Sequence, residues 1–209
     1  MITANEIYEK LEIVYGKPRW WSDDPYIVMV QSILVQNTVW SSVEKVTDTI
    51  LSELKPERLL RLDDEKLQEM IRSCGFCKGK SATIRRITQW YGKYSYNANT
   101  VRKLGKDQLR KELLSIKGIG AETADVILVY AFHKPSFVID TYTRRFLERM
   151  GFQFDSDDEI RTFFEIGVDE DFQIYGWLHW LLLEHGIEHC KKVPVCDKCA
   201  FEKDCKNCG

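Results

Sequence analysis

The segment 113–145 reads LLSIKGIGAETADVILVYAFHKPSFVIDTYTRR. Its Gly118-Ile119-Gly120 turn separates a helix expected over Asp107–Ile116 from a second helix expected over Ala121–Phe132. Glycine tolerates positive φ angles and leaves room for a close neighbour, so the pair predicts a tight hairpin between the two helices. The second helix would begin with backbone N–H groups that have no partner inside the helix, and such groups bind phosphate oxygens.

An aspartate follows the second helix in an apolar setting. Asp140 comes directly after Phe137-Val138-Ile139 and is followed by Thr141 and Arg144. A GIG turn that opens a helix, with such an aspartate after it, resembles the helix-hairpin-helix motif of the endonuclease III (HhH-GPD) superfamily of DNA glycosylases. The resemblance implies that Asp140 is the catalytic aspartate. The alternative from another class of protein is a helical hairpin that packs or binds DNA without catalysis.

The composition is that of a folded protein, because 209 residues with 44% hydrophobic content can form one large or two small cores. The net charge of −2 does not indicate a nucleic-acid-binding protein, but the charge is unevenly distributed. Between residues 78 and 111 there are ten lysines and arginines and one acidic residue, Asp107, so one face can be strongly positive. No signal peptide or apolar run of bilayer length is recognisable, so we expect a cytoplasmic, nucleoid-associated protein.

Helical patterns with short connections dominate the sequence, and strand-like alternation is almost absent, so we expect an all-α fold. Capping signals mark several helix starts, such as Thr3 with Glu6 and Asp24 with Pro25. The expected elements of the first half are, in order, a helix to about Tyr15, a helix over Tyr26–Val35, a helix capped by Ser41 or Ser42 and reaching about Leu54, a short helix capped by Asp63 and Asp64 and reaching Arg72, and a turn over Cys74–Lys80. They are followed by a helix over Ser81–Tyr94, a loop over Asn97–Lys106 that could include one helical turn, the two hairpin helices, a helix over Thr141–Met150, an acidic-capped helix over Ser156–Ile166 and a helix over Phe172–His185.

The resemblance also implies two helical lobes with DNA bound in a cleft between them. One lobe would comprise residues 23–133 and contain the hairpin. The other would combine residues 1–22 with residues 134–209 and carry a cysteine-rich tail that holds an iron–sulfur cluster. The polar link His133-Lys134-Pro135 lies where the chain would cross from one lobe to the other.

Four cysteines lie close together near the end of the sequence, in the pattern Cys190-x5-Cys196-x2-Cys199-x5-Cys205. Four thiolates at this density suit either a [4Fe–4S] cluster or a tetrahedral zinc ion, and their spacing does not separate the two. Endonuclease III carries a cluster on a similar tail, with six residues in the first gap instead of five, so the resemblance favours the cluster. Cys208 is an alternative to Cys205 as the fourth ligand. Cys74 and Cys77 have no second pair and are interpreted as structural.

A glycosylase must rotate its target nucleotide out of the double helix, which requires phosphate contacts and a side chain that fills the vacated space. The resemblance assigns the phosphate contacts to the N–H groups of Gly118 and Gly120, and the filling side chain to Gln36. Lys191 and Lys192, beside the cluster loop, would contact DNA phosphates as well. We therefore expect double-stranded DNA with a damaged base as the partner of a monomeric protein.

The residue two positions after Gly120 bears on the type of reaction. Bifunctional members of the superfamily have a lysine there, which attacks C1′ as an amine. This chain has Glu122 instead, and a carboxylate cannot form a Schiff base. We therefore expect monofunctional, hydrolytic base removal, in which Asp140 stabilises a cationic sugar and orients the attacking water.

Three tryptophans, Trp20, Trp21 and Trp40, add a finer resemblance to the endonuclease III-type 3-methyladenine DNA glycosylases. N-alkylated purines are cationic, so they leave readily and can stack between electron-rich rings, a contact worth ~0.5–2 kcal/mol per ring. The three tryptophans and Glu122 are the expected base pocket, and packing in the core is the alternative role for each ring. A second enzymatic alternative is an endonuclease III-like lyase for oxidised pyrimidines, against which Glu122 counts.

Overall fold

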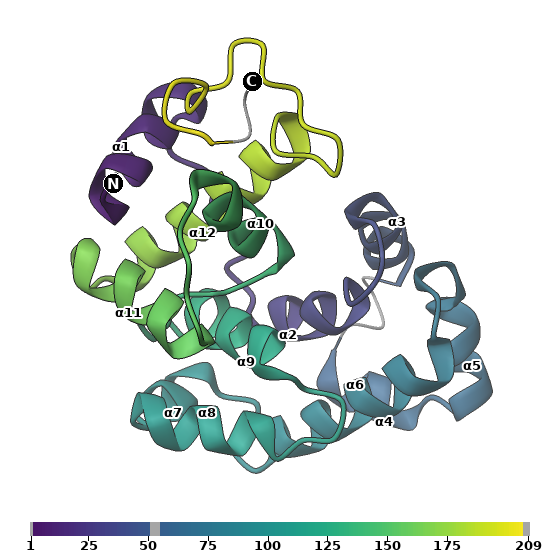
Figure 1. The fold of residues 1–209 in the computed structure, drawn as a ribbon. Coiled ribbons are helices and arrows are strands. Elements are labelled where there is room, and N and C mark those ends of the chain that lie inside the picture. Colours follow the sequence, from purple (N-terminus) through teal and green to yellow (C-terminus); the bar gives the residue numbers. More distant parts are fainter. Residues whose placement is uncertain (1, 51–54, 207–209) are drawn as a thin grey trace. The chain divides into compact units, whose positions relative to one another are not determined.

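The structure of the protein is a computed structural model that describes residues 2–50 and 55–206. Regular secondary structure within these two ranges is entirely helical, which confirms the predicted all-α class. The chain divides into two compact units, one formed by Trp21–Lys134 and the other by Met1–Trp20 together with Pro135–Gly209. Figure 1 follows the chain through its helices.

Helix α2 (Pro25–Leu34) is the central element of the unit Trp21–Lys134. The Asp24 carboxylate caps it by accepting a hydrogen bond from the Tyr26 N–H at 2.8 Å. The helix is apolar on nearly every side, and its buried face packs against α6 and against the segment that follows α9. The other helices of this unit are α3 (Trp40–Ile50), α4 (Pro56–Arg61), α5 (Asp64–Met70), α6 (Cys77–Gly92), α7 (Ala98–Arg102), α8 (Lys106–Leu114) and α9 (Ala121–Val126).

The second unit is organised around α12 (Phe172–Glu188), which packs against α1 (Ala4–Tyr15) and α10 (Thr141–Met150). Helix α11 (Asp157–Gly167) packs against α1. The shared core contains fully buried side chains from all four helices, each worth ~1.5–3 kcal/mol of burial free energy. Among them are Ile7, Leu11, Leu147, Phe164, Leu178 and Leu182.

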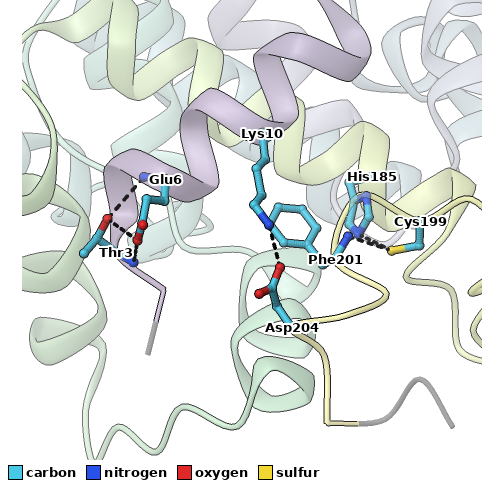
Figure 2. Close-up of polar contacts among 7 residues, drawn as sticks. All are labelled: Thr3, Glu6, Lys10, His185, Cys199, Phe201 and Asp204. Carbon is cyan, nitrogen blue, oxygen red and sulfur yellow. Dashed lines mark hydrogen bonds and ion pairs between the residues drawn. The ribbon is translucent and has the colours of Figure 1, made fainter.

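The predicted capping box at the start of α1 is confirmed. Figure 2 shows the Thr3 hydroxyl accepting a hydrogen bond from the Glu6 N–H at 3.2 Å, while the Thr3 N–H donates to the Glu6 carboxylate at 2.7 Å. The reciprocal pair satisfies two N–H groups that the helix itself leaves without partners. The helix expected to begin at Ser156 begins one residue later, at Asp157, because Ser156 caps it by accepting from the Glu159 N–H at 3.3 Å.

Some helix boundaries differ from the sequence-based expectation. Helix α3 begins at Trp40, so Ser41 and Ser42 lie inside the helix and do not cap it, and its expected end near Leu54 lies outside the described residues. Helix α6 begins at Cys77, because the turn is completed early by Gly75 and Phe76, both at positive φ. The short helix α4 was not predicted from the sequence.

The helix after the hairpin changes its pitch. It is α-helical over Ala121–Val126 and continues as a π-helical segment over Ile127–Ala131, where the Phe132 N–H donates to the Ile127 carbonyl at 3.2 Å. π-Helical turns are rare, and the spacing of apolar residues along the sequence does not distinguish them from α-helical turns. The segment is buried throughout and packs against α2, so it anchors the hairpin to the centre of its unit.

Candidate active site

Asp140 lies at the start of α10 and caps that helix. Its Oδ1 accepts a hydrogen bond from the Thr143 N–H at 2.7 Å, and only 6% of the residue is exposed. Burial raises the pKa of the Asp140 carboxyl, but hydrogen bonding and charge interaction with His179, together with Thr143, outweigh burial and leave the pKa below its ordinary value. The carboxylate is therefore buried and still ionised at neutral pH.

The sequence did not point to His179, the partner of Asp140 on α12. The His179 Nε2 lies 3.6 Å from the Asp140 Oδ2, and the two side chains are 7% and 8% exposed. In the sequence His179 is one of two histidines in an apolar helix, and a histidine in that setting is typical of a core position. A general rule could have suggested a partner for Asp140, because a buried ionisable side chain needs a polar group beside it.

Gly118 is a glycine for two structural reasons. Its φ angle is +103°, and a Cβ atom added there would collide with the side chain of Thr83 on α6. Gly120 caps α9 at φ −93°, and a Cβ atom there would meet nothing within 4 Å. The hairpin is closed by the Ile119 N–H, which donates to the Ile116 carbonyl at 3.0 Å.

Gln36, at the end of α2, contacts the hairpin directly. Its side-chain amide donates to the Gly118 carbonyl at 3.2 Å and to the Thr123 hydroxyl at 2.9 Å. The structure therefore brings together Gln36 and Gly118, two of the residues assigned to DNA binding. The contact of Gln36 with the hairpin could not be read from the sequence, because the two segments are far apart along the chain.

A groove beside the hairpin combines cationic side chains with one exposed aromatic ring. Phe76 is 73% exposed and has a left-handed backbone with φ +48°. The exposed Phe76 ring thus lies among the cationic residues of the groove. The lining residues are Gln36, Asn37, Phe76, Lys78, Gly79, Lys80, Ala82, Thr83, Arg86, Lys117 and Gly118.

The three tryptophans of the expected base pocket have different surroundings. Trp21 contacts Trp40 edge to face, with ring centroids 5.2 Å apart, and contacts Tyr130 at 5.3 Å. The Trp21 Nε1–H also donates to the buried Gln31 side chain at 2.7 Å. Trp20 belongs to the other unit and contacts Phe172 edge to face at 5.6 Å. Trp21 and Trp40 therefore touch each other and do not form two parallel faces around a gap.

Glu122 occupies the first turn of α9 and is exposed. A negative charge in the first turn of a helix interacts favourably with the helix dipole. Asp125, one turn further on, is 1% exposed and forms a two-pronged ion pair with Arg110 of α8, at 2.9 Å and 3.2 Å. Asp125 thus joins the two helices of the hairpin, and Glu122 is the acidic residue that remains at the surface.

The four tail cysteines Cys190, Cys196, Cys199 and Cys205 line a single pocket. Arg149 donates to the Cys190 sulfur at 3.1 Å, and the Phe201 N–H donates to the Cys199 sulfur at 3.5 Å. Figure 2 shows His185 beside Cys199, with 3.8 Å between the ring nitrogen and the sulfur.

The surroundings of Cys199 favour its thiol form. Burial raises the pKa of the Cys199 thiol, and the other three cysteines raise it further. Four cysteines that line one pocket, two of them accepting N–H donors at sulfur, have the chemistry of ligands for a cluster or a metal ion that neutralises thiolates. Within residues 2–50 and 55–206, no three His, Cys, Asp or Glu side chains surround one metal-ion position, and Cys208 lies outside those ranges.

Lys191 and Lys192 are exposed in the same loop. The Lys192 carbonyl accepts a hydrogen bond from Arg149 at 3.1 Å, so the backbone of this basic segment is tied to α10. No helix in the described part of the chain has the length and hydropathy needed to cross a membrane.

The family model and the similar proteins both indicate a base excision DNA repair protein. Residues 30–167 match the HhH-GPD superfamily of base excision DNA repair proteins. A Methanocaldococcus jannaschii protein named as a candidate DNA repair glycosylase, MJ1434, is 38% identical over 207 residues, covering 96% of this chain and 94% of that protein. Endonuclease III of Sulfolobus acidocaldarius is 30% identical, covering 99% of this chain and 96% of the relative.

Two solved structures share the fold. Endonuclease III trapped in a covalent complex with DNA superimposes with a TM-score of 0.82 at 23% identity, over 99% of this chain and 97% of that one. The H. pylori 3-methyladenine DNA glycosylase MagIII, bound to 1,N6-ethenoadenine, superimposes with a TM-score of 0.79 at 24% identity, over 93% and 100%. With a family match over most of its length and a full-length relative at 38% identity, the chain belongs to the HhH-GPD superfamily of base excision DNA repair proteins.

Proposed function

We propose that the protein is a DNA glycosylase that hydrolyses the bond between deoxyribose and an N-alkylated purine such as 3-methyladenine, without strong lyase activity. The observation that carries the proposal is the placement of Asp140, a buried carboxylate whose Oδ1 accepts from the Thr143 N–H at 2.7 Å and whose Oδ2 faces the His179 Nε2 at 3.6 Å. Burial opposes its ionisation, yet His179 and Thr143 keep the pKa of the carboxyl below its ordinary value. A buried, ionised and positioned carboxylate is what a reaction through a cationic sugar requires.

The chemistry follows from charge development. As the bond from C1′ to the base nitrogen lengthens, positive charge grows on the sugar ring, and the Asp140 carboxylate stabilises it without having to reorganise. The electron pair of the breaking bond goes to the base. Water adds to C1′ from the free face, and its proton is transferred to the carboxylate or to solvent.

Glu122 supports the absence of strong lyase activity. Lyase chemistry in this superfamily needs an amine that attacks C1′ and forms a Schiff base. The position of that amine in the bifunctional members holds a carboxylate here, on the exposed first turn of α9. Water is then the nucleophile, and the product keeps an intact DNA strand with an abasic site.

The preference for an alkylated purine is supported by charge and by the aromatic residues. A purine methylated at N3 or N7 carries a positive charge, so it leaves without prior protonation. Trp21, Trp40 and Tyr130 form an aromatic cluster whose rings are electron-rich and only partly covered at Trp21 and Trp40. Cation–π contacts with such rings favour a cationic base over a neutral one. Trp20 is proposed as a further ring of the base pocket.

Double-stranded DNA is the proposed partner of a monomeric protein that acts on the nucleoid. The groove beside the hairpin supports this, because Lys78, Arg86 and Lys117 line it together with Gln36 and Phe76. The backbone N–H groups of Gly118 and Gly120 are proposed as phosphate contacts, and Lys191 and Lys192 as additional ones. Such contacts are sequence-independent and weaken as the salt concentration rises.

A [4Fe–4S] cluster, with zinc as the alternative, is the proposed cofactor of the tail. It would be held by four cysteines that line one pocket, Cys190, Cys196, Cys199 and Cys205. Arg149 donates to the Cys190 sulfur, and the Phe201 N–H donates to the Cys199 sulfur. When bound, the cluster would join the four cysteines and so hold together a loop that has little apolar core of its own. It would thereby fix the basic segment that contains Lys191 and Lys192.

The test is release of bases from DNA that has been methylated at random. The purified protein should release 3-methyladenine or 7-methylguanine as free bases, identified by chromatography, and should leave abasic sites that are cleaved only after alkali treatment. A protein that releases no methylated purine would contradict the proposed substrate class. Unmodified DNA is the matched control, because it lacks the cationic base.

A second candidate function is that of a bifunctional lyase for oxidised pyrimidines, favoured by the relatives named endonuclease III. Reduction with borohydride separates the two functions, because it traps a Schiff base between an enzyme amine and C1′ as a covalent complex. The proposed hydrolase gives no such complex on DNA with an oxidised pyrimidine or with an alkylated purine. A strong covalent adduct with the unmodified protein would favour the second function.

A further inference from the structure

The Asp140 carboxylate is held at both of its oxygens. Oδ1 accepts from the Thr143 N–H at 2.7 Å, which is the cap contact of α10. Oδ2 faces the Nε2 of His179 at 3.6 Å, on a different helix. Helix capping alone needs only the first contact, so the second contact has no role in forming α10.

The position of His179 is fixed by the core of its unit. His179 is 6% exposed, and its neighbours on α12, Leu178 and Leu182, are fully buried. Helix α12 packs against α10 along this face. Because the ring is enclosed by packed side chains, its nitrogen is held beside Asp140 with little freedom to turn away.

The other cationic groups near Asp140 are engaged elsewhere. Arg144, in the first turn of α10, forms a two-pronged ion pair with Asp157 of α11. Arg145 stacks over the Tyr142 ring at 5.0 Å and donates to the Cys190 carbonyl at 2.7 Å. Among the described residues, His179 is therefore the side chain whose ring nitrogen faces the Asp140 carboxylate.

We propose that His179 is a positioning residue for base excision, which acts through Asp140 by directing an N–H group at Oδ2 and fixing the carboxylate toward the sugar. This inference rests on the proposed glycosylase function of Asp140. The 3.6 Å separation is longer than that of a short hydrogen bond, so the contact acts mainly through electrostatic attraction between the ring N–H and the carboxylate. In a buried site such an interaction is strong, because little water is present to screen it.

The test compares two substitutions of His179. His179→Met keeps a side chain of similar length and removes the N–H donor, whereas His179→Gln retains an N–H group near the place of Nε2. The single-turnover rate of base release should fall about 10- to 100-fold in His179→Met, and His179→Gln should recover most of that loss. Affinity for the damaged DNA should stay unchanged in both, since His179 acts on the chemical step.

The control is Leu178→Met, a substitution of similar volume at the adjacent buried position of α12. It should leave the rate unchanged, so that a loss in His179→Met cannot be assigned to repacking of the helix. The inference is overturned if His179→Gln is no better than His179→Met, if neither variant loses rate, or if the loss lies in DNA affinity.

A second measurement does not depend on catalysis. A double-mutant cycle compares the free energies of unfolding in urea of the unmodified protein, Asp140→Asn, His179→Met and the double variant. A direct interaction predicts that the double variant loses less stability than the sum of the single variants, and additivity would overturn the inference. If the unmodified protein releases no base while the cycle shows coupling, the proposed function fails and the Asp140–His179 pair stands.

Discussion

The side-chain amide of Gln36 donates a hydrogen bond to the Gly118 carbonyl at 3.2 Å, so the end of the central helix α2 is bound to the hairpin turn. A second bond from the same amide to the Thr123 hydroxyl, at 2.9 Å, extends the contact to the first turn of α9. The residue proposed to fill the vacated space in DNA and the turn proposed to hold phosphate are thus parts of one hydrogen-bonded unit. A change in the conformation of the hairpin backbone should therefore displace the Gln36 side chain.

Gly118→Ala should destabilise the protein much more than Gly120→Ala. At Gly118 the backbone has φ +103°, and a Cβ atom would collide with Thr83, so strain and overpacking add to a loss of at least about 2 kcal/mol. At Gly120 the φ angle is ordinary and the space is open, so the loss should be about 1 kcal/mol or less. Urea unfolding measures both, and equal losses would contradict the described hairpin geometry.

Lys80→Met should destabilise the unit Trp21–Lys134. The Lys80 ammonium is buried and donates to the Leu34 carbonyl at 2.8 Å, the Cys74 carbonyl at 2.7 Å and the Thr38 hydroxyl at 2.8 Å. Removing the amine leaves these acceptors without their donor, at a cost of about 2–4 kcal/mol in unfolding free energy.

Lys78→Met is the matched control for Lys80→Met, because Lys78 is an exposed lysine two positions away on the same helix. Its effect on stability should stay within about 0.5 kcal/mol. Thermal or urea unfolding of both variants makes the comparison. A Lys80→Met protein as stable as Lys78→Met would mean that the buried amine does not hold the end of α2 to the turn before α6.

Glu122→Lys should convert a protein without lyase activity into one that forms a covalent complex with DNA. The substitution restores an amine in the position that bifunctional members use, on the exposed first turn of α9. Borohydride trapping on damaged DNA followed by gel electrophoresis detects the complex. Glu122→Gln removes the charge without adding an amine and should give no adduct. If Glu122→Lys is not trapped while it still releases base, residue 122 does not lie where the resemblance puts it.

Cys199→Ser should abolish binding of the metal cofactor and with it the visible absorbance expected of an iron–sulfur cluster. Cys77→Ser, at a cysteine outside the tail, should keep the full iron content. Elemental analysis of iron, sulfide and zinc in the purified variants gives the result. Iron retained in Cys199→Ser would contradict the assigned ligands, and zinc in the unmodified protein would replace the cluster by the alternative cofactor.

Local signals in the sequence predicted much of the fold. Thr3 with Glu6, and Asp24 with Pro25, each place a hydrogen-bond acceptor at a helix start, and the corresponding helices begin there. The limits of α10 at Thr141 and Met150 agree with the sequence as well, because Asp140 caps the helix and Gly151 ends it in a left-handed conformation. These features depend on residues within one or two turns of each other.

Contacts between distant segments could not be predicted. His179 faces Asp140 because α12 packs against α10, and Gln36 reaches Gly118 because α2 lies beside the hairpin. Neither relationship has a local sequence signal. The edge-to-face contact of Trp21 with Trp40 is of the same kind, since the sequence supplied the two rings and not their relative orientation.

Asp140→Asn tests the central claim most directly. Asparagine is a good helix-capping residue of the same shape, so α10 and DNA binding should be retained while the negative charge is lost. We expect single-turnover release of methylated purines from DNA to fall at least about 100-fold, with unchanged affinity for the damaged duplex. Release at the rate of the unmodified protein would contradict the role of Asp140 as the charge that stabilises the sugar.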